Sequence, residues 1–156
     1  MKSITEKLFE KAIELELKIG ELYTLFSELF PQDACFWKEL HEEESNHAFI
    51  IETAKEAMFT TGFSSKIMIP DDISSLETSI NRVTELISEY NNNPTPCREK
   101  AFEQAIEIEN STGESHYEIA MSKATHSTAL DIFQKLNNDD KNHAERIQKY
   151  YNLKLK

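Results

Sequence analysis

Two short stretches of this chain nearly repeat one another, Glu-Glu-Ser-Asn-His-Ala at 43–48 and Asp-Asp-Lys-Asn-His-Ala at 139–144. Each places a carboxylate three residues before a histidine. On a helix, residues three apart lie on one face, about one turn from each other. A carboxylate and an imidazole directed at one point form half of a metal site, so two such pairs predict a dinuclear centre. The pairs are Glu44 with His47 and Asp140 with His143.

Length and composition exclude several classes of function. With 156 residues the chain is expected to form one domain over 1–156. It carries 28 acidic and 17 basic residues, a net charge of −11, which argues against a nucleic-acid partner. No apolar run approaches the roughly 20 residues that a membrane span needs. Cys35 and Cys97 form no paired motif and no signal peptide is evident, so we expect small apolar or surface roles for both and a cytoplasmic protein.

The elements that position the two pairs are helices. Only three glycines and four prolines interrupt the chain, and apolar residues recur with helical periodicity throughout. The pattern predicts an all-α fold in which two long hairpins are separated by a crossover of about thirty residues, the topology of a ferritin-like four-helix bundle. The predicted long helices cover 3–30, 34–61, 96–123 and 128–153, with a short accessory helix over 73–90 lying across the body.

Two glycines lie inside the long helices, at equivalent places of an internal repeat. The segment 12–16 (AIELE) resembles 105–109 (AIEIE), and Gly20 and Gly113 each follow its last glutamate by four residues. A glycine inside a helix costs about 1 kcal/mol relative to alanine. Something at this level therefore needs space: a bridging ligand, a substrate or a facing side chain.

Periodicity also turns one carboxylate of each long helix inward. Glu16 falls within the apolar stripe of the first helix, whereas Glu14 lies on its polar face. In the acidic runs 42–44 and 139–140, only one carboxylate of each is expected to face inward, and the others to be solvated. The predicted inward groups are Glu16, Glu109, Glu44 with His47, and Asp140 with His143.

Four buried carboxylates require compensation, because each costs several kcal/mol unpaired and they repel one another. No lysine or arginine lies beside them on the inner stripes. Two divalent ions would balance four carboxylates, and mixed oxygen and imidazole ligation suits iron, manganese or zinc. Di-iron and di-manganese bundles use one Glu from each of two helices and a Glu-x-x-His from each of the others.

On these motifs the chain resembles the rubrerythrin family of the ferritin-like superfamily, over nearly its whole length. The segments AIELELKIGELY, EEESNHA, AIEIENSTGESHY and DDKNHA stand where that family has its four helix motifs. The resemblance implies a di-iron centre, hydrogen-bonding of Tyr23 and Tyr117 to ligand glutamates of the opposite hairpin, peroxide reduction, a homodimer and an external electron donor such as a rubredoxin-like protein. The implied metal ligands are Glu16, Glu44, His47, Glu109, Asp140 and His143.

The chain departs from this family in three respects. Asp140 replaces a glutamate and is one methylene shorter, so it is expected to bind one ion terminally, or through water, where glutamate would bridge. Thr112 stands where the family has an extra glutamate. A rubredoxin domain is missing, so electrons would come from a separate protein.

These departures leave alternatives open. A dinuclear oxidoreductase that reduces hydrogen peroxide is the leading hypothesis. A non-catalytic metal-binding, iron-handling or redox-sensing protein is the second, and a metal-free bundle acting through its surface is the third. His41 and His116 lie near enough to serve as extra ligands or ligand partners, but we expect packed or surface roles for both, and a solvent position for His126.

Overall fold

The computed structural model describes residues 2–60, 70–121 and 128–156, with only the backbone described for 70–72, 117–121 and 128–130. Every regular element in these parts of the chain is helical, as predicted. The elements are α1 (Ile4–Leu29), a 3₁₀ turn η1 (Pro31–Asp33), α2 (Ala34–Thr60), α3 (Pro70–Asn92), α4 (Arg98–Met121) and α5 (Thr128–Lys154).

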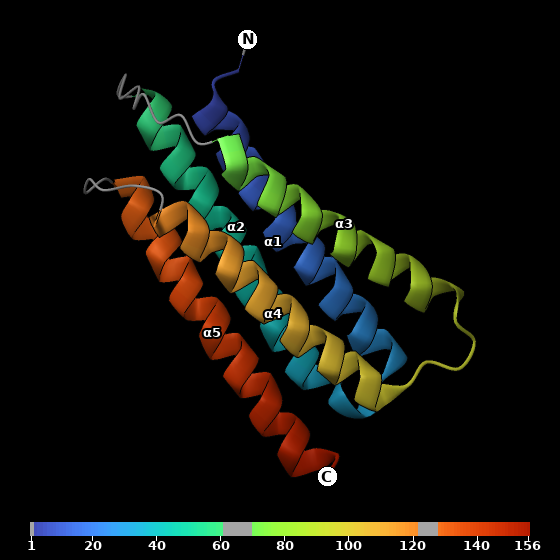
Figure 1. The fold of residues 1–156 in the computed structure, drawn as a ribbon. Helices are drawn as coiled ribbons and strands as arrows, with labels where there is room; N and C mark the ends of the chain where they lie inside the picture. Colours follow the sequence, from blue (N-terminus) through green and yellow to red (C-terminus); the bar gives the residue numbers. More distant parts are fainter. Residues whose placement is uncertain (1, 61–69, 122–127) are drawn as a thin grey trace.

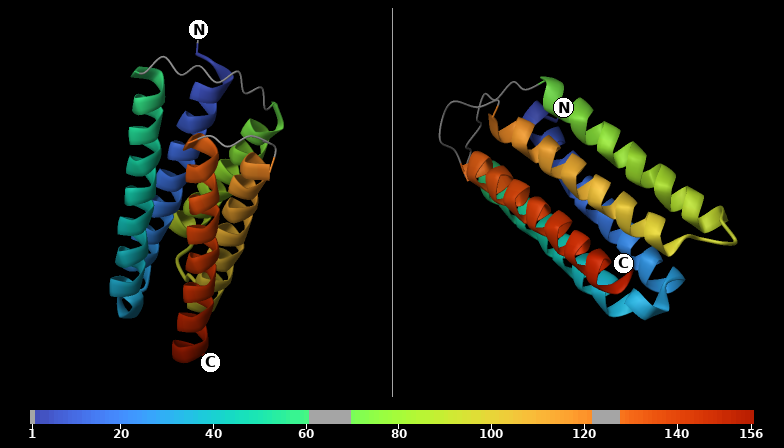
Figure 2. Two further views of the ribbon diagram at one scale, coloured as in Figure 1. Left: turned by 90° about the vertical axis from the view of Figure 1, so that its left-hand side faces the viewer. Right: turned by 60° about the horizontal axis from the view of Figure 1, so that its bottom comes forward.

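The helices pack as two hairpins joined by α3. Helix α1 packs chiefly against α2 and α4 chiefly against α5, while α3 contacts α1 and α4 (Figure 1). The two hairpins lie side by side, and the ends of the chain are at opposite ends of the bundle (Figure 2). This arrangement faces the inner stripes of four long helices toward one another.

The predicted boundaries hold to within a few residues, with two corrections. Ser3 caps α1, and its hydroxyl accepts a hydrogen bond from the Glu6 amide at 3.1 Å. Helix α3 begins at Pro70, which the sequence placed in a connection, because proline suits a first helical turn. Helix α4 begins at Arg98 rather than Pro96. The predicted end of the second helix at residue 61, the connection that follows it up to residue 69, the turn 124–127 and His126 lie outside the described residues.

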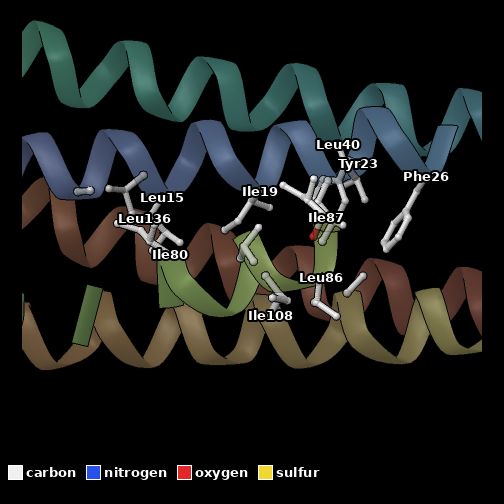
Figure 3. Packing of buried hydrophobic residues seen from close by; sticks show 14 of the residues in the cluster. Leu15, Ile19, Tyr23, Phe26, Leu40, Ile80, Leu86, Ile87, Ile108 and Leu136 are labelled. Carbon is white, nitrogen blue, oxygen red and sulfur yellow. The ribbon is translucent and has the colours of Figure 1, made fainter. Parts of the chain in front are cut away.

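Helix α3 is longer than the predicted accessory helix and follows α1 and α4 along the bundle instead of crossing it. Its apolar residues are buried against them, and Figure 3 shows Ile80, Leu86 and Ile87 projecting into the same cluster as Leu15 and Ile108. Burying one such aliphatic side chain contributes about 1.5–3 kcal/mol. The crossover is therefore part of the core that holds the hairpins together.

A polar clamp also links the hairpins. Asp33, in the turn of the first hairpin, is 1% exposed. Its carboxylate accepts two hydrogen bonds from the Arg98 guanidinium of α4, at 2.6 and 2.7 Å, and one from the Tyr150 hydroxyl of α5, at 2.9 Å. The buried carboxylate of Asp33 therefore fixes one hairpin against the other.

No helix in the described parts of the chain is long and apolar enough to span a membrane.

Candidate metal centre

The four long helices of the hairpins each contribute one carboxylate to the interior. Glu16 of α1, Glu44 of α2, Glu109 of α4 and Asp140 of α5 are all 0% exposed. Helical periodicity turns them inward, as predicted from the stripes. Lys11 forms an ion pair with Glu14, which stays on the outer surface.

The inward groups gather into two clusters that share one residue. Within each cluster, every residue offers one possible ligand atom, and these atoms all lie within 4.8 Å of one another. Glu44 belongs to both clusters, whereas Asp140 belongs to only one. This asymmetry agrees with a carboxylate too short to serve two ions. The clusters are Glu16, Glu44, His47 and Asp140, and Glu44, Glu109 and His143.

Within each cluster the histidine Nδ1 faces two carboxylates. His47 Nδ1 lies 3.1 Å from Glu16 Oε2 and 3.2 Å from Glu44 Oε2. His143 Nδ1 lies 2.8 Å from Glu44 Oε1 and 3.5 Å from Glu109 Oε2, without the alignment of a hydrogen bond. The two imidazole rings are stacked, with centroids 5.3 Å apart. Donor atoms of both clusters therefore converge on neighbouring points.

Unpartnered polar atoms are concentrated at the two clusters, as expected of residues that can hold cations. Eight buried side-chain nitrogen or oxygen atoms of the described residues have no hydrogen-bond partner, and six of them are in or beside the clusters. Buried polar groups are normally satisfied, because an unpaired one costs about 1–3 kcal/mol. Divalent ions would satisfy these atoms together. The six atoms are Glu16 Oε1, Glu44 Oε1, Glu109 Oε2, His116 Nε2, Asp140 Oδ1 and His143 Nδ1.

The charges of the site are strongly coupled. Burial, with the charges of Glu109 and Glu16, raises the pKa of Glu44 well above its ordinary value. Burial lowers the pKa of His47, but hydrogen bonds and charges of Glu16 and Glu44 outweigh it and raise the pKa to about 11. Glu109 and Glu44 likewise outweigh burial and raise the pKa of His143 to about 12. Both imidazoles therefore hold protons at neutral pH, which a metal ion would have to displace on binding.

The two helical glycines make room for the helices that carry the Glu-x-x-His and Asp-x-x-His pairs. A Cβ added at Gly20 would lie 3.1 Å from His41 Nδ1 and 3.6 Å from Glu44 Cβ. A Cβ added at Gly113 would lie 3.5 Å from Asp140 Cβ. Of the three explanations given by the sequence, a facing side chain is the one observed.

One predicted tyrosine contact is present. The Tyr23 hydroxyl of α1 donates a hydrogen bond to Glu109 Oε1 of the opposite hairpin. Burial and the nearby Glu109 raise the pKa of Tyr23 well above its ordinary value, so the phenol remains a donor. The side chain of Tyr117 lies outside the described residues.

The structure corrects the prediction that only Glu44 and Asp140 in the acidic runs face the site. Glu43 Oε2 lies 2.6 Å from Nε2 of His143, and Asp139 Oδ2 lies 3.4 Å from Nε2 of His47. Each contact crosses from one hairpin to the other. Carboxylates in this position orient metal-binding histidines and fix the tautomer that leaves Nδ1 free to bind. Glu43 and Asp139 occupy matched places in the near-repeat, one residue before Glu44 and Asp140. This match could have indicated from the sequence that both carboxylates contact the site.

His116 is the second correction, because it is neither a surface residue nor packed only among apolar groups. It is 0% exposed, with Nδ1 at 2.7 Å from Asp140 Oδ2 and Nε2 at 3.5 Å from Glu16 Oε1. His116 follows Glu109 by seven residues, as Tyr23 follows Glu16, and this spacing could have revealed it.

The remaining residues singled out by the sequence lie away from the clusters. His41 is part of the first hairpin, where its Nδ1 lies 2.9 Å from the Gly20 carbonyl oxygen. Thr112 is buried and its hydroxyl donates to the Ile108 carbonyl, so it adds no carboxylate to the site. Both cysteines are exposed.

A pocket of about 230 Å³ leads from the surface between α2 and α5 to both histidines. Each helix lines it with an acid, an asparagine and a histidine at the same spacing. A pocket of this size admits a small polar molecule or a hydrated ion to the Nε2 side of the imidazoles. The lining residues are Glu43, Asn46 and His47 from α2, and Asp139, Asn142 and His143 from α5.

A scan against models of protein families found no match, and searches of curated proteins and of solved structures found none either. The case for a metal centre therefore rests on the geometry of the site and on the helix motifs.

Proposed function

We propose that this protein binds two metal ions, iron in the first instance, in a dinuclear centre of rubrerythrin type within a ferritin-like bundle. The observation that carries the proposal is the sharing of Glu44 by two buried clusters whose facing donor atoms lack hydrogen-bond partners. A carboxylate shared in this way can bridge two cations and place them next to each other. The ligands would be Glu16, Glu44, His47 and Asp140 for one ion, and Glu44, Glu109 and His143 for the other.

The proposed activity is reduction of hydrogen peroxide to two molecules of water, which consumes two electrons and two protons. A pair of redox-active ions supplies two electrons at one place. The pocket between α2 and α5 admits a molecule as small as peroxide. Tyr23 holds Glu109 in place through its hydroxyl, and Glu43 and Asp139 orient the two histidines.

The electrons in this proposal come from a separate, rubredoxin-like protein. The chain has only two cysteines, both exposed, and neither belongs to a paired motif that would bind a rubredoxin-type iron. A homodimer, implied by the family resemblance, completes the proposal.

One observation favours a second candidate, a non-catalytic role in iron handling or redox sensing. Asp140 reaches only one cluster and Thr112 adds no carboxylate, so the ion at Glu109 and His143 has few protein oxygens. A site with fewer carboxylates compensates less of the charge of an oxidised ion pair. Such a site would bind ferrous ions and oxidise without repeated turnover.

The test begins with elemental analysis of the full chain loaded anaerobically with ferrous iron, for which about two ions per chain are expected. The reduced protein is then mixed with peroxide or with oxygen, and its reoxidation is followed by absorbance. Faster reaction with peroxide, and repeated turnover with an added electron donor, are expected of the oxidoreductase. Reaction with peroxide no faster than with oxygen would refute it, and iron bound without turnover would favour the second candidate.

Glu16→Gln and Glu14→Gln form a matched pair for this test. The two residues lie on the same helix, one in the centre and one in a surface ion pair. We expect Glu16→Gln to lose iron and Glu14→Gln to keep two ions per chain. Equal loss in both variants would show that the binding measured is not at this site.

A further inference from the structure

We propose that Tyr23, Trp37 and Tyr150 form a relay that carries a one-electron oxidation from the metal centre to the surface of the protein. This inference deepens the proposed function and rests on it. The relay removes an oxidising equivalent that peroxide leaves at the centre when the electron donor runs short, before side chains around the metal are damaged.

The inner end of the relay is Tyr23. Its side chain is fully buried, and its hydroxyl donates a hydrogen bond to Glu109 Oε1. The phenol ring stacks on the indole of Trp37, with centroids 5.4 Å apart and planes inclined by 29°. Tyrosine and tryptophan are the aromatic side chains that lose an electron most readily. An oxidisable pair in direct ring contact therefore leads away from the candidate ligand Glu109.

Two phenylalanines connect Trp37 of α2 to Tyr150 of α5. The ring centroid of Phe36 lies 5.3 Å from that of Trp37 and 4.1 Å from that of Tyr150, on which it stacks. The centroid of Phe102 lies 4.6 Å from Trp37 and 5.5 Å from Tyr150. Phenylalanine is too hard to oxidise to hold the radical, but its ring fills the gap across which the electron tunnels. Tyr150 is partly exposed, so the relay ends at the surface.

The indole nitrogen of Trp37 gives a second, independent argument. Trp37 is 0% exposed, and its Nε1 has no hydrogen-bond partner. An unpaired buried donor destabilises the folded state, and a phenylalanine in this place would avoid that loss. An oxidised indole is a stronger acid than a neutral one, but without an acceptor it keeps its proton. The oxidation is therefore not trapped at Trp37 and passes on to Tyr150.

Both tyrosines, unlike Trp37, have a carboxylate that can take up a proton. The Tyr23 hydroxyl donates to Glu109, and the Tyr150 hydroxyl donates to Asp33 Oδ1 at 2.9 Å. A phenol loses an electron readily only when its proton can leave at the same time. The tyrosines at the two ends of the relay therefore have the partner that such a step requires.

This requirement distinguishes Tyr150 from Tyr90, which also lies near the relay. Phe26 connects Tyr90 to Trp37, with its ring centroid 4.9 Å from the first and 5.0 Å from the second. The Tyr90 hydroxyl, however, donates to Gln104 Oε1 at 2.6 Å. A side-chain amide is too weak a base to take the proton of a phenol. The geometry therefore favours Tyr150 as the exit.

The electrons and protons balance as follows. Reduction of one peroxide to two waters consumes two electrons and two protons, and the protons come from solvent. When the metal centre holds a single reducing electron, Tyr23 supplies the second and passes its phenol proton to Glu109. Trp37 then reduces the Tyr23 radical, which recovers its proton, and Tyr150 reduces the oxidised Trp37 and releases its own proton to Asp33. A one-electron reductant in solution, such as a thiol or ascorbate, restores Tyr150, which takes its proton back.

The experiment uses the full chain loaded anaerobically with ferrous iron and half-oxidised with ferricyanide. Peroxide and a nitroso spin trap are then added without an electron donor, and the trapped residue is identified by mass spectrometry of peptides. We expect the adduct on Tyr150. Two bound ions that react with peroxide but give no adduct on Tyr150 would overturn the inference and leave the proposed function standing. Failure of the chain to bind iron would overturn both.

Variants make the test specific. Trp37→Phe removes the middle of the relay without altering a candidate ligand, so it should keep two ions per chain and lose the adduct on Tyr150. Tyr90→Phe is the matched control and should keep both. An unchanged adduct in Trp37→Phe would overturn the inference. So would equal marking of Tyr150 and Tyr151, which is the result expected of a diffusing radical, because the Tyr151 ring lies 6.0 Å from Phe102 and is also partly exposed. The adduct of the wild type decides the matter even if Trp37→Phe does not fold.

Discussion

Replacing Glu44 with glutamine should stabilise the protein without metal and destabilise it with metal. Glu44 is the one residue common to both clusters, and it is fully buried. Glutamine keeps its size but has no charge and is a poor bridging ligand. The substitution therefore removes a repulsion from the metal-free protein and a bridge from the metal-bound protein.

The magnitude without metal follows from the raised pKa of Glu44, which burial and the charges of Glu109 and Glu16 produce. A carboxyl whose pKa is higher in the folded state than in the unfolded state weakens folding at any pH above its unfolded value. Each tenfold difference in proton affinity corresponds to about 1.4 kcal/mol. Since glutamine does not ionise, we expect metal-free Glu44→Gln to be more stable than the wild type at pH 7.

The magnitude with metal follows from mass action. An ion at one hundred times its dissociation constant stabilises the folded chain by about 2.7 kcal/mol, so two ions contribute about 5 kcal/mol. For a chain of this size each kcal/mol raises Tm by roughly 2–4 °C, which predicts a rise of about 10–20 °C for the wild type. Because both clusters lose a ligand in Glu44→Gln, that rise should almost vanish.

The assay is calorimetric or fluorescence-monitored melting with and without Mn²⁺, which avoids redox chemistry. Glu42→Gln serves as control, since Glu42 lies on the same helix but is exposed, and its metal-dependent rise in Tm should equal that of the wild type. The reasoning fails if Glu44→Gln retains more than half of the rise. It also fails if the metal-free variant is less stable than the wild type.

Three further predictions concern protons, glycines and Asp140. Metal affinity should rise between pH 6 and pH 8, by up to about tenfold per pH unit for each proton that the metal displaces. The reason is that the raised pKa values of His47 and His143 keep both imidazoles protonated in this range. Calorimetry of metal binding in buffers of different ionisation enthalpy should show the release of protons. Gly113→Ala should raise the free energy of unfolding, measured in urea, by about 0.5–1 kcal/mol. Gly20→Ala should raise it by less. A Cβ at Gly20 would lie only 3.1 Å from a histidine nitrogen, whereas a Cβ at Gly113 would lie 3.4 Å from its nearest atom. Asp140→Glu should strengthen binding of the more weakly held ion and raise the rate of reaction with peroxide. If the affinity for that ion is unchanged in the variant, the short side chain of Asp140 does not limit the site.

Much of the fold could be read from periodicity and from helix-ending residues. The first helix was predicted within one residue of each end, because Ser3 caps it and Pro31 follows its C-terminus. Helix α3 begins three residues before its predicted start, because proline suits a first helical turn. A longer α3 than predicted then packs along α1 and α4.

The sequence by itself determined which side chains turn inward, because a helix fixes the direction of each side chain about its own axis. That rule placed Glu16, Glu44, Glu109 and Asp140 in the interior, and the structure brings these four residues and both histidines together. It required no knowledge of how the helices pack.

Only the tertiary structure decided which inward groups meet. The contacts of Glu43 with His143, and of His116 with Glu16, join residues about one hundred positions apart on different hairpins. They depend on the rotation and register of one hairpin against the other, which the buried α3 and the Asp33 clamp set. Periodicity within one helix carries no information about that register. The sequence therefore predicted the inward carboxylates and missed the residues that contact them and the two histidines from the other hairpin.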